Sequence, residues 1–284
     1  MRSFRKRAFA VQYADWDRAG QSRFSRRAAL TGLVAAGTLA FGGGRAWGAA
    51  PAGALSFLAE AVAAEDGRML RLADGRRVVL PHILPPGPDR HEAMADTGPI
   101  RDAARVLADL ALGRVLRVDL SDPAQDRHGR LRARVAVDGM DLAESLAAAG
   151  MVRIFPEPGA EPERIAALIG AESRARMAGI GFWSDGYFAV QAADPPDFSV
   201  DRFEIVSGIV RKVTPVGDRD HLEFGPDWRV DFTAGLDRSL RRELAARGQP
   251  VDTLPGRAVT VRGWLRSWNG PFMEIRDPTG ITLP

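Results

Sequence analysis

The stretch DRHGRLRARVAVDGMDLAESLAAAGMVRI, residues 126–154, decides the fold of the first half of the chain. It opens on a tight Asp-x-x-Gly-Arg turn at Asp126, Gly129 and Arg130. Polar and apolar residues then alternate over residues 129–139, as is typical of a half-buried strand that ends at an Asp-Gly turn. The small and apolar residues that follow indicate a short helix. The stretch therefore predicts turn, strand, turn and helix in succession.

The flanking segments predict more strands and helices of the same half. Residues 58–84 alternate and are interrupted by two Asp-Gly pairs, which predicts a meander of three strands. Helical spacing of apolar residues predicts a helix over 97–114 and a longer one from 161 to about Gly179, and residues 114–120 read as another strand. A curved five-stranded sheet with helices on it is an OB-type barrel, so we predict a mainly β fold with α-helical cover.

Three segments of this half, residues 65–86, 126–154 and 172–184, resemble the staphylococcal-nuclease-like (thermonuclease) family in order and spacing. The resemblance extends over roughly residues 58–188 and implies calcium-dependent hydrolysis of phosphodiesters. It implies two arginines that clamp the phosphate, a glutamate that positions the attacking water and two aspartates on the metal. Arg130 stands at one of the arginine positions, so the resemblance implies a catalytic role for it.

The other positions of that apparatus are altered. The first metal aspartate is replaced by Arg68, the other arginine by Val79, the second aspartate by Leu84 and the glutamate by Gly87, while Pro86 is retained. Calcium takes about 6 to 8 oxygen ligands, and these side chains supply none. We therefore expect an inactive member with no cofactor and no metal site. In such a member Arg130 would serve the turn by pairing with Asp126.

The alternative is a divergent calcium-dependent nuclease that acts on DNA or RNA. In that case Asp89 or Glu92 supplies a carboxylate from the following loop, and Arg77 reaches the phosphate. Two nearby features have simpler interpretations. Glu172 and Arg176, four residues apart on the long helix, are expected to form a surface ion pair, and Trp183 is expected to close the core at the end of that helix.

The stretch AADPPDFSVD, residues 192–201, is typical of a linker, so we predict two domains, 51–191 and 202–284. The second domain shows three strands, a helix and two strands, the order of a five-stranded OB barrel. The helix is indicated by the leucine spacing at Leu236, Leu240 and Leu244. The end of this domain also resembles bacterial OB-fold nucleic-acid-binding and stress-protein modules.

OB domains bind single strands with basic grooves and exposed aromatic side chains. The candidates for such binding are Arg262, Trp264, Arg266 and Trp268, with Trp228, Arg229, Phe232 and Phe272 as further aromatic and basic residues. Because 13 basic and 12 acidic residues nearly cancel over residues 201–284, attraction of phosphates is weak, and a protein-contact or scaffold role competes with nucleic-acid binding.

Residues 1–50 predict a twin-arginine export signal. Arg26 and Arg27 follow Ser25, and residues 28–41 carry no charge. Such a run rises about 21 Å as a helix against roughly 30 Å of hydrocarbon, so no stable membrane span is expected after cleavage. We expect a periplasmic or secreted protein.

Charge and composition exclude several classes of function. Residues 1–50 hold nine of the 39 Lys and Arg residues and two of the 36 Asp and Glu residues. The remainder therefore carries 30 basic against 34 acidic groups and is not a uniformly basic binder of nucleic acid. Cysteine is absent, which excludes disulfides and thiolate metal sites, and the four histidines lack metal-ligand spacing. The sequence as a whole indicates an exported binding or assembly module for an unknown protein partner or envelope component, with nucleic acid as the other candidate.

Overall fold

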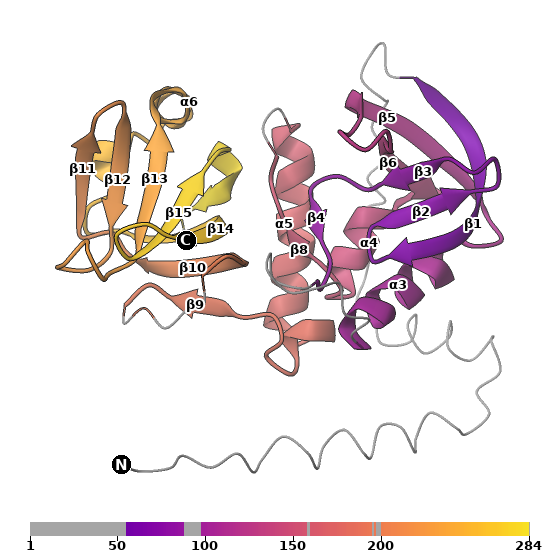
Figure 1. Cartoon of the computed structure of the whole chain (residues 1–284), viewed down its shortest axis with the longest axis horizontal. Helices are drawn as coiled ribbons and strands as arrows, with labels where there is room; N and C mark the ends of the chain where they lie inside the picture. The colour runs from indigo at the N-terminus through magenta and orange to yellow at the C-terminus, as the bar shows by residue number, and fades with distance from the viewer. Residues whose placement is uncertain (1–54, 88–97, 158–159, 195, 197–199, 284) are drawn as a thin grey trace, which may run out of the picture. The chain divides into compact units, whose positions relative to one another are not determined.

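The computed structural model describes residues 55–87, 98–157, 160–194, 196 and 200–283 (Figure 1). The predicted export signal and the two loop residues Asp89 and Glu92 lie outside the described residues. Among the helices that are described, none has the length and hydropathy needed to cross a bilayer.

The first half of the described chain forms a closed barrel of five strands. These are β1 (Ser56–Asp66), β2 (Met69–Leu72), β3 (Arg77–Val79), β5 (Val115–Gln125) and β6 (Leu131–Val137). They pair in the order β3-β2-β1-β5-β6, and a parallel pairing of β6 with β3 closes the ring. The predicted OB-type barrel is therefore confirmed for this half. A short strand, β7 (Met140–Asp141), extends the sheet by pairing with β6. A separate sheet of two short strands consists of β4 (Ile83–Leu84) and β8 (Arg153–Ile154).

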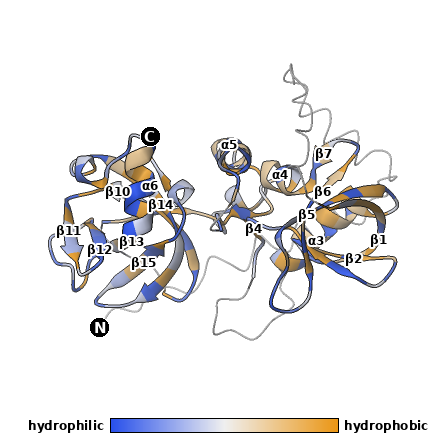
Figure 2. Ribbon diagram, turned by 90° about the horizontal axis from the view of Figure 1, so that it is seen from above, coloured by the Kyte–Doolittle hydropathy of each residue, from blue (hydrophilic) through white to orange (hydrophobic). Residues whose placement is uncertain are grey.

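Residues alternate between core and exterior along β6, as the sequence predicts. Leu131, Ala133 and Val135 are buried in the core, whereas Arg132 and Arg134 are only partly buried. Figure 2 shows a similar mixture of hydrophobic and hydrophilic residues along β1 and β2. Three helices pack with this barrel: α3 (Gly98–Ala111), α4 (Leu142–Ala148) and α5 (Pro162–Met177). Trp183, just after α5, is half-buried with its ring centroid 5.4 Å from that of Phe188.

The second half repeats the same strand order. Its strands are β10 (Phe203–Ile209), β11 (Lys212–Val216), β12 (Arg219–Glu223), β13 (Thr233–Asp237), β14 (Ala258–Ser267) and β15 (Pro271–Ile275). The order across the sheet is β11-β12-β13-β15-β14-β10, and only two residues separate β10 from β11, so these two form a bent first strand. In both barrels the third strand lies parallel to the fifth, and a helix precedes the fourth. That helix is α6 (Arg238–Ala246) in the second barrel.

Two boundaries differ from the sequence prediction. Leu236 belongs to β13 and not to the helix, because the side chain of Asp237 caps α6 by accepting from the backbone N–H of Leu240 at 2.8 Å. Leucines at four-residue spacing cannot by themselves locate such a cap. At the predicted linker, β9 (Val190–Ala192) pairs with β10, and Ala193 is buried in the core of the second barrel. Strand pairing therefore continues into the first residues of that stretch.

Both barrels belong to one compact unit, and side chains connect them. Arg153 of β8 donates to the backbone oxygen of Phe203 at 2.7 Å. The ring of Phe155 packs edge-on against Phe203 and against Trp264 of β14, with centroids 5.5 and 6.4 Å away. These contacts bring the end of β8 against the outer face of β10 and β14.

Candidate functional site

The turn before β6 holds Arg130, for which the resemblance implies a catalytic role. Asp126 Oδ1 accepts from the backbone N–H groups of His128 at 2.8 Å and Arg130 at 3.0 Å, and its Oδ2 accepts from Arg130 Nε at 2.7 Å. Arg130 Nη2 lies 2.6 Å from the same carboxylate, and Nη1 lies 3.6 Å from Met69 Sδ. The predicted pairing of Arg130 with Asp126 is therefore confirmed, and the guanidinium presents two of its nitrogens to one carboxylate.

The protonation of Asp126 supports this arrangement. Burial raises the pKa of its carboxyl, but hydrogen bonds from the side chain and backbone of Arg130 and from His128 outweigh burial and lower the pKa to about 2. Asp126 is therefore ionised at neutral pH. The ion pair with Arg130 persists throughout the physiological pH range.

The altered positions surround the neighbouring loop. The backbone N–H of Arg68 donates to Asp66 Oδ1 at 2.7 Å, and its Nη1 lies 3.4 Å from the carbonyl oxygen of Ile83, the residue before Leu84. Val79 is buried and pairs with Met69 of β2 and, in parallel, with Arg132 of β6. The guanidinium of the residue at the first implied aspartate position thus lies against the residue that precedes the second, Leu84.

A family model for staphylococcal nuclease homologues matches residues 91–185. This part of the chain is similar to staphylococcal nuclease homologues. Comparison with curated proteins gave no match. The matched part of the nuclease-like domain contains the Asp126 to Arg130 turn, but it begins after residues 68–87, which include all the altered positions.

The outward arginines at the start of β6 in the nuclease-like domain are all paired with acids. They occupy alternate positions, so their side chains project from the same face of the strand. Each has a carboxylate partner: Asp126 for Arg130, Glu157 for Arg132 and Asp141 for Arg134. Arg77, the arginine proposed as a substitute phosphate ligand, is exposed and pairs with Glu65 at 2.9 Å. Among the described residues, no group of three or more histidines or acids is placed to hold a metal ion.

His82 is an unusual residue that sequence reasoning missed. It is buried with a φ of 68°, in the left-handed region that non-glycine residues rarely adopt, and its Nδ1 has no hydrogen-bond partner among the described residues. Burial lowers the pKa of its imidazole to about 4, and the positive charges of Arg164 and Arg132 act in the same direction. The negative charge of Asp141 opposes them. Its backbone conformation has no signature in the residue pattern.

The four predicted nucleic-acid residues of the second barrel alternate along one strand. Arg262, Trp264 and Arg266 project from the outer face of β14, because Val261 and Leu265 at the alternate positions point into the core. Trp268 follows at the turn into β15 and continues the series. The four candidates thus share one face, although their surroundings differ.

Arg262 is engaged by the nuclease-like domain. Its Nη1 donates to Glu172 Oε2 at 2.8 Å and to the backbone oxygen of Ile154 at 3.2 Å, and both charged side chains are almost fully buried. Glu172 Oε1 accepts from the backbone N–H of Ile154 at 2.7 Å. The predicted surface pair of Glu172 with Arg176 is therefore wrong, because this face of α5 is covered.

Trp268 lies on an aromatic cluster at the other end of the outer face. Its side chain is 51% exposed, and its ring centroid lies 4.8 Å from that of Phe272 and 6.1 Å from that of His221 on β12. Of the other aromatic candidates, Phe232 is buried in the core, whereas Trp228 is exposed beneath the guanidinium of Arg229. Trp268 is therefore an exposed aromatic ring on the outer face of the second barrel.

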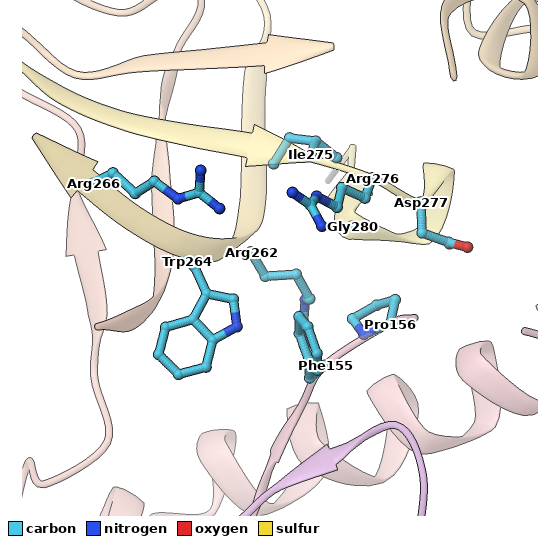
Figure 3. A pocket seen from close by; sticks show the side chains of 9 residues that line it. All are labelled: Phe155, Pro156, Arg262, Trp264, Arg266, Ile275, Arg276, Asp277 and Gly280. Carbon is cyan, nitrogen blue, oxygen red and sulfur yellow. The ribbon is translucent and has the colours of Figure 1, made fainter. Parts of the chain in front are cut away.

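A cavity of about 250 Å³ opens where the nuclease-like domain meets β14 (Figure 3). Its lining residues are Phe155, Pro156, Arg262, Trp264, Arg266, Ile275, Arg276, Asp277 and Gly280. In Figure 3 Arg266 and Arg276 extend toward the space between them, and Arg262 runs past Trp264 toward Phe155. Three arginines and two aromatic rings thus surround one space.

Proposed function

We propose that the nuclease-like domain does not hydrolyse phosphodiesters and that the chain acts as an exported binding or assembly module. The observation that carries the proposal is the position of the Arg68 guanidinium, 3.4 Å from the Ile83 oxygen. Hydrolysis needs a metal or guanidinium charge aimed at the phosphate oxygens and an oriented water. A calcium ion beside Arg68 would instead meet a like charge and no carboxylate at Leu84.

The arrangement of Arg130 supports the same proposal. A phosphate that approached this guanidinium would compete with Asp126, whose pKa of about 2 keeps it ionised. Val79, at the position for which the resemblance implies the other arginine, is buried and apolar, so it cannot bind the phosphate. Arg130 has a sufficient role in holding the turn.

The test is a cleavage assay with the full chain, single-stranded DNA and calcium, with and without a chelator. We expect no chelator-sensitive cleavage. Chelator-sensitive cleavage that disappears in Arg130→Ala, but persists in Arg127→Ala, would establish the divergent nuclease instead. Because Arg130→Ala also removes a turn contact, its thermal unfolding must be compared with that of the parent chain.

A second candidate function is the binding of single-stranded nucleic acid by the second barrel, and the exposed ring of Trp268 favours it. OB domains bind oligonucleotides over their second and third strands and the adjoining loops. Here Trp268 packs beside His221, which belongs to β12, the second strand of the second barrel. Base stacking contributes about 1–3 kcal/mol per base. Binding that weakens with salt and is lost in Trp268→Ala, but not in Trp228→Ala, would support this function.

Export is part of the proposal and rests on the sequence pattern at Arg26 and Arg27. The double variant Arg26→Lys/Arg27→Lys keeps the charge and removes the arginine pair. We expect the parent chain in the periplasm or medium with a new N-terminus near residue 50, and the variant in the cytoplasm. Equal export of the two would contradict this part.

A further inference from the structure

The outer face of β1 and β5 in the first barrel exposes apolar side chains. Leu58 of β1 is 71% exposed, Val115 of β5 57% and Val62 of β1 51%. The outward face of an antiparallel sheet is usually polar, and on β2, β3 and β6 it carries arginines with carboxylate partners. Apolar side chains that gather on one exposed face, unlike single ones, indicate an interaction surface.

The strand register arranges this face as a square of four residues. Leu58 lies opposite Arg117, and Glu60 lies opposite Val115. Leu58 and Val115 are therefore diagonal neighbours, and Glu60 and Arg117 occupy the other diagonal, each pair about 7–8 Å apart. One diagonal of the square is thus apolar, and the other carries two opposite charges.

Both charged groups of the square are accessible. Glu60 is exposed, and its carboxylate forms no ion pair among the described residues. Arg117 donates from Nε to Asp119 Oδ1 at 3.0 Å, and its side chain is still 44% exposed. Asp119 is buried and also accepts from Ser56 Oγ at 2.6 Å, so it holds the guanidinium on this face.

This square is complementary to a second copy of itself, as a two-fold symmetric dimer requires. Consider two such faces packed together, with a two-fold axis between them along the diagonal from Leu58 to Val115. Each of these apolar residues then meets the same residue of the other copy. The rotation exchanges the ends of the charged diagonal, so Glu60 of each copy meets Arg117 of the other. An axis along the charged diagonal would instead oppose like charges.

We propose that two copies of the chain associate through the outer face of β1 and β5, with Leu58 and Val115 at the centre and two reciprocal ion pairs of Glu60 with Arg117 beside them. The inference rests on the assembly role proposed above and deepens it by naming a second copy of this chain as the partner. Because the apolar centre is small, the dimer is weak and forms at micromolar concentration or above.

The test is analytical ultracentrifugation of the full chain and of charge-reversal variants over a micromolar concentration series. We expect the parent chain to dimerise. Glu60→Arg and Arg117→Glu should each weaken dimerisation at least tenfold, because each variant alone brings like charges together twice in the dimer. An equimolar mixture of the two, and the double variant Glu60→Arg/Arg117→Glu, should restore it to within threefold of the parent chain. Mixing cannot repair a defect within one chain, so this recovery identifies a contact between copies.

The matched control is Glu243→Arg, which reverses an exposed charge on α6 of the second barrel. It should dimerise as the parent chain does, whereas Leu58→Asp should weaken dimerisation at least tenfold.

A parent chain that stays monomeric at high micromolar concentration would overturn the inference, as would single charge variants that dimerise like the parent. Binding of a monomeric chain to phospholipid vesicles, lost in Leu58→Asp, would assign this face to a membrane surface instead. A monomer that does not cleave DNA would leave the proposed loss of hydrolysis standing, whereas cleavage by a dimer would overturn that loss alone.

Discussion

Arg262 of the second barrel and Glu172 of the nuclease-like domain form a buried ion pair, with Arg262 Nη1 2.8 Å from Glu172 Oε2. The acid also accepts from the backbone N–H of Ile154, and the guanidinium also donates to the oxygen of the same residue. The pair thus attaches α5, β8 and β14 to one another. It joins the two barrels through a buried, charged contact.

Replacing Glu172 by alanine should destabilise the chain by about 3–5 kcal/mol, because it leaves the Arg262 guanidinium buried without a counter-ion. Chemical denaturation at neutral pH measures the change. Arg176→Ala is the control, since the sequence predicted that residue as the partner of Glu172, and it should alter stability by no more than about 0.5 kcal/mol. A larger loss in the Arg176 variant than in the Glu172 variant would contradict the observed pairing.

Gly150→Ala should destabilise the nuclease-like domain by about 3 kcal/mol or more. Gly150 has a φ of 67°, and an added Cβ would overlap the carbonyl oxygen of Ile180, so backbone strain and overpacking add together. Gly139→Ala separates the two effects, because Gly139 has a φ of 79° and nothing within 4 Å of an added Cβ. It should cost about 1 kcal/mol. Equal losses in thermal unfolding would show that packing at Gly150 is unimportant.

His82 should make stability depend on pH in mildly acidic solution. Its folded pKa of about 4 lies below the ordinary 6.5, so between these values the unfolded chain binds more protons. The stabilisation by neutral His82 is therefore complete above pH 6.5 and is lost as the pH falls toward 4, by up to about 3 kcal/mol.

The variant His82→Asn isolates this effect, because asparagine tolerates positive φ and does not titrate. Urea denaturation of both chains at pH 7, 5.5 and 4.5 gives the difference in the free energy of unfolding. We expect the parent chain to lose more stability than the variant over this interval. Parallel curves for the two chains would show that His82 titrates normally.

Calcium should not raise the melting temperature of the parent chain, since Arg68 and Leu84 supply no oxygen ligand there. The double variant Arg68→Asp/Leu84→Asp places two carboxylates at these positions. Calcium should then raise its melting temperature by several degrees, because a ligand that binds only the folded state stabilises it. Arg68→Ala removes the cation without adding a ligand and should show no calcium effect. A rise in the parent chain would contradict the proposed loss of the metal site.

Both barrels could be predicted from the sequence, because inward and outward residues alternate along their strands and Asp-Gly pairs mark several turns. The Asp126 to Arg130 pairing was also predictable, since donor and acceptor lie within one tight turn. The role of Glu172 was not: helical spacing identifies neighbours on the same helix, whereas its partner Arg262 is 90 residues away along the chain. The conformation of His82 depends likewise on tertiary contacts, which local patterns do not record.

The alternation along β6 has an evolutionary consequence. Ring closure depends on backbone pairing with β3 and on Leu131, Ala133 and Val135, whereas chemistry depends on the residues between them. The residues that support the barrel and the residues that face outward thus lie on opposite sides of one strand. Substitutions on one side can therefore accumulate without disturbing the other. A lineage could discard an enzyme and keep its scaffold through substitutions at every second residue.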